Sequence, residues 1–267
     1  FRQLYRKTVR SQTGTEDHWI TADEFHREIT GLIFEVQTDL FLPCGGRPET
    51  IHTDNWKLLF SEKGIPNTRV IVEGANSFIT PEARTYLQKN GVVLLRDATA
   101  NKGGVISSSY EIIANLLFNE KEFSRHKEAY VTDVIDILER RVEEEVCLIF
   151  KRFHENRESR LYTEISDDIS REINGHYTRI FEYFQQKKHM AVESIFLKTI
   201  LRHLPDFIRN NPKYRTRIRN LPSKIMSAIL AVELATTIVY CGGWELDFEN
   251  RLKTFAKNNL TSHRTER

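Results

Sequence analysis

Cysteine is scarce in this chain of 267 residues, and its pattern excludes several kinds of site. The three cysteines, Cys44, Cys147 and Cys241, are far apart, and no Cys-x-x-Cys pair occurs. A disulfide framework or a zinc site is therefore not expected, and the pattern favours a reducing compartment. The nine histidines include no His-x-x-x-His pair, which removes the simplest helical metal site. We expect no metal.

A strong net charge is also missing. The chain has 39 Lys and Arg against 37 Asp and Glu, which gives a formal charge of +2. No global field points to nucleic acid or to an anionic membrane, so neither is an expected partner. The chain starts at Phe1, with helix-like residues Leu4, Tyr5 and Val9, and shows no signal-peptide pattern. We interpret it as a fragment of a longer, soluble, intracellular protein, either cytoplasmic or mitochondrial.

One apolar run, from Ile225 to Trp244, is long enough to raise the question of a membrane span. Glu233 lies near its middle, and a carboxylate at the centre of a bilayer is costly. The run therefore predicts a buried helix of a soluble bundle.

Glycine is unevenly distributed. Nine of the twelve glycines precede Val105, and only Gly175, Gly242 and Gly243 follow it. Glycine-rich turns between short apolar runs are typical of an α/β sheet, whereas a glycine-poor remainder is typical of long helices. We predict an α/β domain over residues 1–119 and a helical domain over residues 120–267.

The first domain alternates predicted strands with predicted helices. A capping box of Thr21 and Glu24 starts a helix whose Phe25, Ile29, Leu32 and Ile33 should face inward. A buried strand is expected at 39–43 and further strands at 69–73 and 92–95. Helices are expected at 55–63, from Thr80 to Asn90, and from Gly103 to Leu117. This order predicts the second half of a Rossmann-like, doubly wound parallel sheet.

The second domain has helical periodicity. One long helix should bury a stripe made of Val131, Ile135, Leu138, Val142, Val146, Ile149 and Phe153. Further helices are expected at 165–184, 192–204, 224–241 and 248–255, with breaks at Pro205, Pro212 and Pro222. The charged run from Glu139 to Glu145 is interpreted as a solvated surface.

Small residues follow the first strand directly, in Pro43-Cys44-Gly45-Gly46. In open α/β sheets, ligands bind at the carboxyl ends of the strands. Small residues there let a flat ring or a ribose approach the backbone. A tight turn in which Cys44 is merely packed explains the same residues, so both explanations stay open.

Two asparagines and a serine follow the next strands. Asn76 and Asn101 can each give a donor and an acceptor, which suits an amide or a ribose hydroxyl. Gly103 and Gly104 open a helix whose free amides could hold a carboxylate, to which Ser108 could donate. Ordinary turn and helix-start chemistry is the alternative for each of these residues.

Three segments in this region resemble the NAD-dependent glutamate dehydrogenases. They are Pro43 to Thr50 (PCGGRPET), Glu73 to Asn76 with Thr80 to Arg84 (EGAN and TPEAR), and Asp97-Ala98 with Asn101 to Val105 (NKGGV). The first and third segments look like the long-chain, eukaryotic NAD-specific type. The resemblance is strong from Thr38 to Leu117, and it departs from the small-subunit pattern at Lys102 and at Ser77-Phe78-Ile79.

The resemblance implies a role for individual residues. Cys44 and Gly45 would border the nicotinamide and its ribose through backbone groups, and Asn76 and Asn101 would bond the ribose and the carboxamide. Ser108, seven residues after Asn101, would bind the distal carboxylate of the substrate. NAD is the implied cofactor, L-glutamate, 2-oxoglutarate and ammonia are the implied reactants, and the full-length protein is expected to be a homo-oligomer.

The implied reaction is the oxidative deamination of glutamate. The family's proton-transferring lysine and aspartate belong to a preceding substrate domain, and no Gly-x-Gly-x-x-Gly phosphate turn occurs here. No catalytic residue is therefore assigned in this chain, Lys102 being interpreted as a solvated helix-edge lysine, and the chain alone is not expected to turn over glutamate. Two alternatives remain: a dehydrogenase for another amino acid, and a non-catalytic assembly or regulatory segment.

Overall fold

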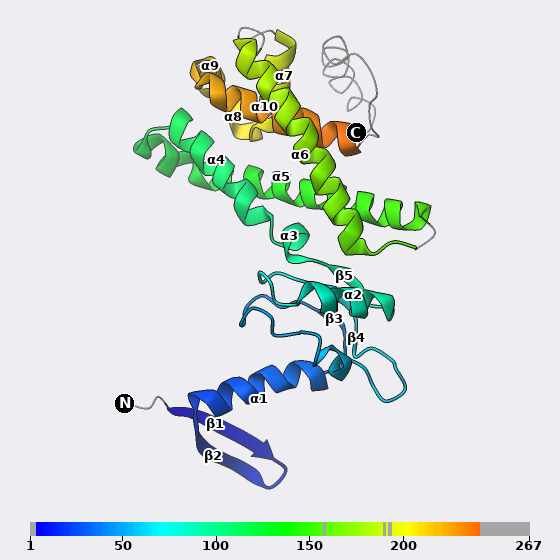
Figure 1. Cartoon of the computed structure of the whole chain (residues 1–267). Helices are drawn as coiled ribbons and strands as arrows, with labels where there is room; N and C mark the ends of the chain where they lie inside the picture. Colours follow the sequence, from blue (N-terminus) through cyan, green and yellow to red (C-terminus); the bar gives the residue numbers. More distant parts are fainter. Residues whose placement is uncertain (1–3, 157–158, 189–190, 192–193, 241–267) are drawn as a thin grey trace. The chain divides into compact units, whose positions relative to one another are not determined.

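The computed structural model describes residues 4–156, 159–188, 191 and 194–240 (Figure 1). By its internal contacts the chain divides into two compact units, Phe1–Asn101 and Lys102–Arg267. The first unit is mixed α/β and the second is helical among its described residues. The predicted domain boundary after residue 119 stays a prediction.

The first unit begins with a β-hairpin, so the prediction of a helical start is wrong. Strands β1 (Leu4–Ser11) and β2 (Gly14–Thr21) are antiparallel, with Leu4 opposite Thr21 and Ser11 opposite Gly14. A two-residue connection between Ser11 and Gly14 favours a tight hairpin. The Tyr5 ring stacks on Phe25 of the following helix, with 4.5 Å between ring centroids.

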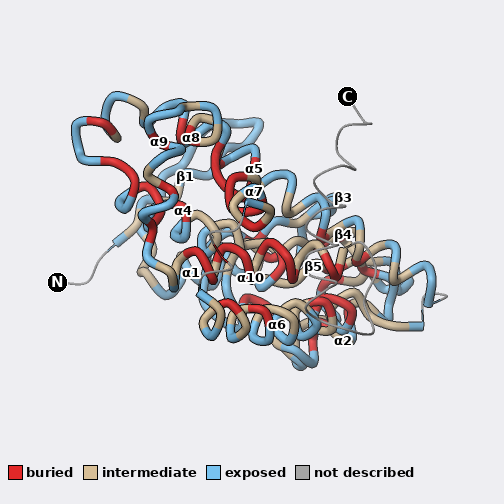
Figure 2. The backbone as a smooth tube through the Cα atoms, turned by 90° about the horizontal axis from the view of Figure 1, so that it is seen from above, coloured by how far each residue is buried: buried red, intermediate tan, exposed pale blue. Residues whose placement is uncertain are grey.

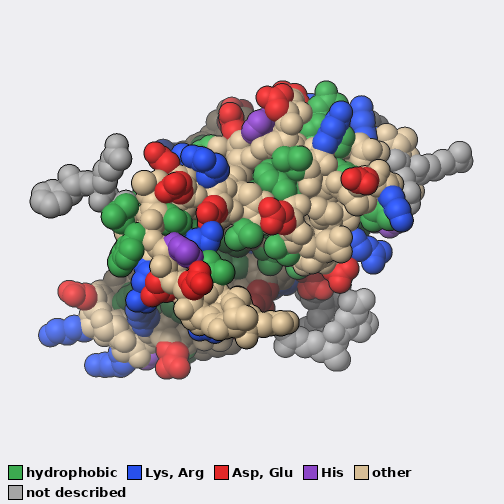
Figure 3. All heavy atoms as spheres, turned by 90° about the horizontal axis from the view of Figure 1, so that it is seen from below, with side chains coloured by type: hydrophobic (Ala, Val, Ile, Leu, Met, Phe, Trp, Pro, Cys, Tyr) green, Lys and Arg blue, Asp and Glu red, His purple; other side chains and the backbone are tan. Residues whose placement is uncertain are grey.

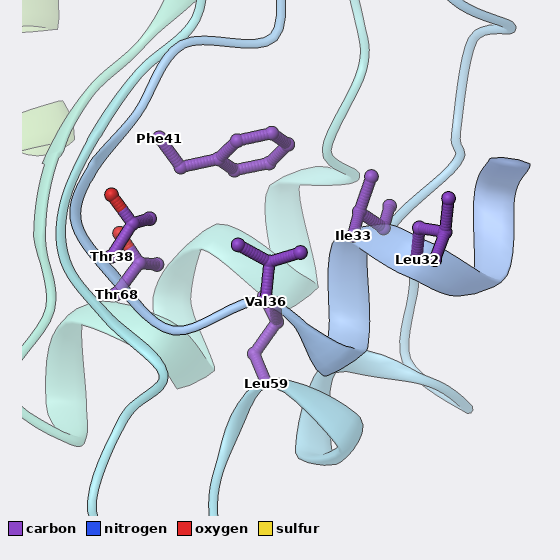
Figure 4. Close-up of a pocket in the computed structure, with 7 residues that line it drawn as sticks. All are labelled: Leu32, Ile33, Val36, Thr38, Phe41, Leu59 and Thr68. Carbon is purple, nitrogen blue, oxygen red and sulfur yellow. The ribbon is translucent and has the colours of Figure 1, made fainter. Parts of the chain in front are cut away.

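Helix α1 (Ala22–Glu35) starts with the predicted capping box, in which Thr21 and Glu24 bond each other's backbone amides. The predicted burial of its apolar side is wrong, because Ile29 is 47% and Leu32 is 52% exposed. The helix packs on the hairpin and on a 3-10 turn over only part of that side. An apolar hollow of about 220 Å³ remains beside it (Figure 4), lined by Leu32, Ile33, Val36, Thr38, Phe41, Leu59 and Thr68.

A three-stranded parallel sheet follows, with the order β3 (Thr38–Phe41), β4 (Thr68–Val72), β5 (Val93–Leu95). The strands predicted at 69–73 and 92–95 are confirmed. The strand predicted at 39–43 forms, but its burial is wrong: Leu40 is 46% and Leu42 is 51% exposed. The reason is that β3 lies at the edge of the described sheet, with β4 as its one strand neighbour there.

Only part of the helix predicted at 55–63 forms. The 3-10 helix η1 (Trp56–Leu59) takes its place. The Asn55 side chain accepts from the amide of His52 and donates to the carbonyl of Thr50. After Leu59 the chain becomes extended, and Phe60 pairs with Pro66. Gly64, with φ +73°, makes the turn between them.

Two further helices complete this unit. Helix α2 (Pro81–Lys89) has Thr80 as its N-cap and Pro81 in its first turn, as predicted, and Gly91 ends it with φ +89°. Helix α3 (Asp97–Ala100) is one turn long. The core between sheet and helices is made of Ile51, Leu59, Ile71, Phe78, Ile79, Ala83, Leu87, Val92 and Leu94.

The second unit is built from helices α4 (Gly103–Leu117), α5 (Glu120–Glu155), α6 (Tyr162–Gln186), α7 (Ser194–His203), α8 (Asp206–Asn210), α9 (Pro212–Arg217) and α10 (Ser223–Tyr240), with a 3-10 turn η3 (Ile218–Asn220). Helix α10 packs against α6 and α7, and its middle is buried (Figure 2). The helices predicted at 165–184 and 224–241 are confirmed within the described residues. The helix predicted at 248–255, and Cys241 at the end of the previous one, lie outside the described residues.

Helix α10 is apolar and long enough to cross a membrane by composition alone. Glu233 at its middle is 8% exposed and pairs with Arg141 and His203. The sequence predicted a buried helix of a helical bundle for this run, and the buried residues of α10 confirm it. Elsewhere, acidic, basic and hydrophobic side chains are interspersed on the face shown in Figure 3.

The predicted stripe of helix α5 is confirmed at Ile149, which is fully buried, and is wrong at its N-terminal end. Val131 is 40% and Ile135 is 47% exposed, whereas Tyr130, Val134 and Ile137 are buried. The charged run on this helix is not uniformly solvated either, since Glu145 is 3% exposed. The helix is contacted by α4, α6, α8 and α10, so its burial depends on several neighbours rather than on one stripe.

Candidate functional site

Three loops leave the carboxyl ends of the three parallel strands, and they contact one another. We call them the strand-end loops: residues 43–46 after β3, 73–77 after β4, and 96–101 after β5. The amide of Ala75 donates to the carbonyl of Pro43 at 2.7 Å, and the amide of Ser77 donates to Asp97 Oδ2 at 2.8 Å. The sequence-based expectation that polar groups meet at this edge of the sheet is therefore confirmed in geometry.

The first two loops touch where a side chain is absent. A Cβ atom built on Gly74 would lie 2.9 Å from Cys44 Sγ and 3.3 Å from the carbonyl oxygen of Pro43. Glycine at position 74 thus permits the close approach of two backbone segments. Cys44 is exposed on its other side, so its packing against Gly74 and a border role toward a ligand are compatible.

The two glycines after Cys44 differ. Gly46 has φ +109°, and an added Cβ would meet the Phe78 ring at 2.9 Å. Gly45 has no atom within 4 Å of such a Cβ, so its backbone faces open space. A flat ligand group can approach the backbone at Gly45, whereas Gly46 serves the turn itself.

The two predicted asparagines are bonded to each other. Asn101 Nδ2 donates to Asn76 Oδ1 and, at 3.2 Å, to the carbonyl of Gly74. The remaining groups, Nδ2 of Asn76 and Oδ1 of Asn101, have no hydrogen-bond partner among the described residues. One free donor beside one free acceptor matches the acceptor and donor of a carboxamide.

A buried ion-pair network supports these loops, and sequence reasoning missed it. Glu73 is fully buried and receives Arg84 in a two-pronged contact, Nε to Oε2 at 2.7 Å and Nη2 to Oε1 at 3.0 Å. The same guanidinium lies 3.3 Å from Asp97 Oδ1. Glu73 also accepts from the amide of Ile79 at 3.1 Å. A glutamate at the end of an apolar strand, with an arginine in the next helix, was the available signal.

Asp97 ties the third loop to the second. Burial raises the pKa of its carboxyl group, but the amides of Ser77 and Ala98 and the charges of Arg84 and Arg96 outweigh burial and hold the pKa below its usual value. Asp97 is therefore ionised at neutral pH. This fixed charge orders the turn that carries Asn76.

Ser108 belongs to the second unit, in the early turns of α4. It is exposed, and its hydroxyl donates to the carbonyl of Gly104 at 3.1 Å. Ser107 and Ser109 make equivalent bonds, to Gly104 and Ile106. A carboxylate ligand would accept the Ser108 hydrogen in place of the Gly104 carbonyl. That carbonyl would still accept the hydroxyl of Ser107. The role of Ser108 toward the substrate stays a prediction.

Lys102, at the start of α4, is not a solvated lysine as the sequence suggested. Its Nζ pairs with Glu145 Oε2 of α5, and the lysine side chain is 23% exposed. Glu145 is buried, and its second oxygen, Oε1, has no hydrogen-bond partner among the described residues. This pair fastens the N-terminus of α4 to α5.

In the described part of the chain, no group of three or more His, Cys, Asp or Glu side chains is placed to hold a metal ion.

Comparison with known proteins identifies the family. The family model of glutamate/leucine/phenylalanine/valine dehydrogenases matches residues 5–154, which is more than half of the chain. This chain belongs to that family. The resemblance predicted from the PCGGRPET, EGAN and NKGGV segments is thereby confirmed.

Individual relatives narrow the comparison. A probable NAD-specific glutamate dehydrogenase of Schizosaccharomyces pombe is 33% identical over 216 residues, covering 76% of this chain and 19% of that protein. Glutamate dehydrogenase 2 of Dictyostelium discoideum is 31% identical over 230 residues, 79% of this chain and 22% of that protein. The NAD-specific glutamate dehydrogenase of Neurospora crassa is 33% identical over 215 residues, which cover 76% of this chain and 20% of that protein. The chain spans about a fifth of the length of these relatives.

Proposed function

We propose that this chain is part of an oxidoreductase of amino-acid catabolism that deaminates L-glutamate to 2-oxoglutarate and ammonia, with NAD as cofactor. The observation that carries the proposal is the Asn76–Asn101 pair at the strand ends, with one donor and one acceptor left free for a carboxamide. The names of the relatives support NAD and glutamate. The parallel sheet supports a doubly wound, Rossmann-like domain over residues 1–119, followed by a helical domain over 120–267.

The residues present fit the nicotinamide half of NAD. Asn76 and Asn101 would bond the carboxamide and the ribose, and the open backbone at Cys44 and Gly45 would border the ring. When bound, NAD would supply the acceptor for the hydride that leaves the α-carbon of glutamate. The work of these residues is to hold the nicotinamide in one orientation toward the substrate.

Ser108 would bind the side-chain carboxylate of glutamate. An acidic side chain can accept the Ser108 hydrogen in place of the Gly104 carbonyl, whereas an apolar substrate gains no hydrogen bond there, so Ser108 favours glutamate over leucine or phenylalanine. The family includes enzymes for all of these amino acids by its description. Substrate choice is therefore a point to test.

The test uses the full-length enzyme. Asn101→Ala should raise the KM for NAD by about tenfold or more, since one good hydrogen bond to a ligand corresponds to roughly that factor. Ser108→Ala should raise the KM for glutamate and leave the KM for NAD unchanged. Ser109→Ala is the matched control, because it is an adjacent exposed serine that also bonds its own helix. If wild-type enzyme prefers leucine or phenylalanine to glutamate, the substrate assignment is wrong.

Assembly and location belong to the same proposal. The full-length protein would be a soluble, intracellular homo-oligomer, in the cytoplasm or in mitochondria. A non-catalytic assembly role for the helical unit remains the second reading, for which the long helix α5 is the available observation. Light scattering decides it: a monomeric chain of residues 1–267 would count against assembly through these helices.

A further inference from the structure

The segment from α7 to the start of α10 is far more basic than the chain as a whole. Between Ser194 and Lys224 it contains one acidic residue, Asp206, and eight basic ones, whereas the whole chain has a formal charge of only +2. The basic residues are Lys198, Arg202, Arg209, Lys213, Arg215, Arg217, Arg219 and Lys224. Like charges gathered on one segment repel each other unless anions lie among them.

Half of these cations have acidic partners within the second unit. Arg202 lies 3.9 Å from Glu233, Arg209 pairs with Asp206, and Lys213 and Arg217 both contact Glu122. Lys213 and Arg217 also lie over the Tyr214 ring. Four cations, Lys198, Arg215, Arg219 and Lys224, have no ion-pair partner among the described residues.

Three of the four unpaired cations line one hollow. Its lining comes from α7 and from the α9–η3 segment of the helical unit, and its volume is about 750 Å³. Lys198 comes from α7, Arg215 from α9 and Arg219 from η3. Among the described residues that line it there is no aspartate or glutamate. Three separate elements thus bring the unneutralised charge of the segment to one place.

The rest of the lining is apolar or carries hydroxyl groups. Leu197, Pro212 and Ile218 supply apolar surface, and Ser194 and Thr216 supply hydroxyls. The Thr216 hydroxyl already donates to the carbonyl of Lys213 at 2.8 Å, which leaves its lone pairs but not its hydrogen available. The volume falls within the range of small-molecule sites, which are typically apolar with a few convergent polar groups.

We propose that this hollow is a binding site for a small organic phosphate. Arginine forks match the oxygen geometry of phosphate, and two of the three cations are arginines. The charge of three cations suits a group with two or more negative charges, and the apolar lining suits a ring or chain attached to it. The site is made by α7, α9 and η3 and shares no residue with the strand-end loops, so it does not rest on the proposed function.

Calorimetric titration of the full-length protein with pyrophosphate tests the proposal. The titration is done at low ionic strength with NAD saturating, so that a phosphate site used by the cofactor is already filled. We expect saturable binding. The double variant Arg215→Gln/Arg219→Gln should weaken it by at least about tenfold, the factor for losing charge-assisted bonds of roughly 1.5–3 kcal/mol. Lys198→Gln should weaken it less, because a lysine makes a single-point contact.

The matched control is Lys224→Gln. Lys224 is an exposed cation of the same segment, also without an ion-pair partner among the described residues, but it does not line the hollow. Its removal should leave pyrophosphate binding within about twofold of wild type, as expected for a charge at a screened distance. Equal weakening by Lys224→Gln would overturn the site, since it would show a general charge effect.

Two further results would overturn the proposal. One is the absence of pyrophosphate binding to the wild-type protein. The other is binding of citrate as tight as that of pyrophosphate, which would show that negative charge alone, and not phosphate, is recognised. Because the three residues are exposed and without ion-pair partners in the described structure, their variants should keep the wild-type circular dichroism spectrum and melting temperature.

Discussion

At the scale of single residues, the strand-end loops depend on what glycine leaves out. Gly74 brings Cys44 and Pro43 against the loop that carries Asn76. The amide pair of Asn76 and Asn101 depends on that loop, because Asn101 also bonds the carbonyl of Gly74. The three strand-end loops are therefore joined in one arrangement.

Gly74→Ala should disrupt this arrangement. The new Cβ would lie 2.9 Å from Cys44 Sγ, so the loops must separate. We expect a loss of about 1–3 kcal/mol in the free energy of unfolding, the usual cost of overpacking, together with weaker NAD binding by the full-length enzyme. Urea denaturation followed by tryptophan fluorescence measures the first effect.

Gly45→Ala is the matched control for that substitution. Its Cβ would meet no atom within 4 Å, and stability should change by less than about 0.5 kcal/mol. If Gly74→Ala were as neutral as Gly45→Ala, the close approach of the loops would not matter for the fold.

Arg84→Met should be among the more damaging substitutions in the first unit. It would leave Glu73, which is fully buried, without its guanidinium partner and would take from Asp97 one of its two arginines, the other being Arg96. We expect a loss of about 3–5 kcal/mol, the range for breaking a buried pair from one side. Chemical denaturation of the variant and wild type measures it.

The comparison for Arg84→Met is Arg152→Met. Arg152 makes an equally two-pronged contact with Glu172, but the Glu172 side chain is 45% exposed. Its loss should cost only about 0–1 kcal/mol. Equal costs at the two sites would show that burial of Glu73 does not set the energy.

At the scale of elements, four helices of the second unit meet around His203. Its Nδ1 lies 3.1 Å from Glu233 Oε2 of α10 and 2.9 Å from Arg141 Nη2 of α5. Tyr110 of α4 stacks on the imidazole with ring centroids 5.3 Å apart, and Arg202 lies beside the same carboxylate. The protonation state of this cluster therefore affects the packing of α4, α5, α7 and α10 against one another.

Stability should fall as the pH drops below about 6.5, the value for a free imidazole. Burial lowers the pKa of His203 more than contact with Glu233 raises it, so the folded state holds a neutral ring while the unfolded chain takes up a proton. Burial would raise the pKa of Glu233, but His203 and Arg141 lower it to about 2, which adds a further loss below the usual glutamate range. Both shifts act in the same direction.

His203→Asn removes the titrating ring and keeps a polar group near the Nδ1 position. We expect its melting temperature to vary less between pH 6.5 and pH 5 than that of the wild type. His18→Asn, on the exposed strand β2, should keep the wild-type slope. A variant at position 203 with an unchanged slope would mean that another group causes the acid sensitivity.

Local signals explain which elements the sequence could predict. Thr21 with Glu24, and Thr80 with Pro81, fix the starts of α1 and α2 because capping is a short-range interaction. Which side chains are buried was harder to predict, since burial depends on neighbours that are distant in sequence. Val131 and Ile135 follow helical spacing and are exposed, while Glu145 is buried and pairs with Lys102 at the start of another helix.

In the candidate site, too, features set by local sequence order could be predicted, and features set by tertiary packing could not. Strand ends gather at one edge of any parallel sheet, so the meeting of Cys44, Asn76 and Asn101 could be predicted from sequence order. The Glu73–Arg84–Asp97 network could not, because it needs the actual orientation of α2 toward β4 and α3. The roles of Cys44, Gly45, Asn76, Asn101 and Ser108 toward NAD and glutamate stay predictions.

At the scale of the whole molecule, the chain covers about a fifth of the length of its NAD-specific relatives. Under the proposed function it would supply groups for the nicotinamide, while no proton-transferring residue is assigned to it. We expect the 267-residue chain alone to show no glutamate-dependent reduction of NAD above background, in an assay at 340 nm in which full-length enzyme is active. Measurable deamination by the isolated chain would refute this division of labour.

The open edge of the sheet has a consequence for handling the protein. Strand β3 pairs with β4 on one side, and among the described residues no strand covers its other side, where Leu40 and Leu42 are exposed. A strand in this state presents free amides and carbonyls beside apolar side chains, which is a template for adding a strand from another molecule. When the chain is produced alone and concentrated, aggregation should begin at this edge, and a charged residue in place of Leu40 should delay it.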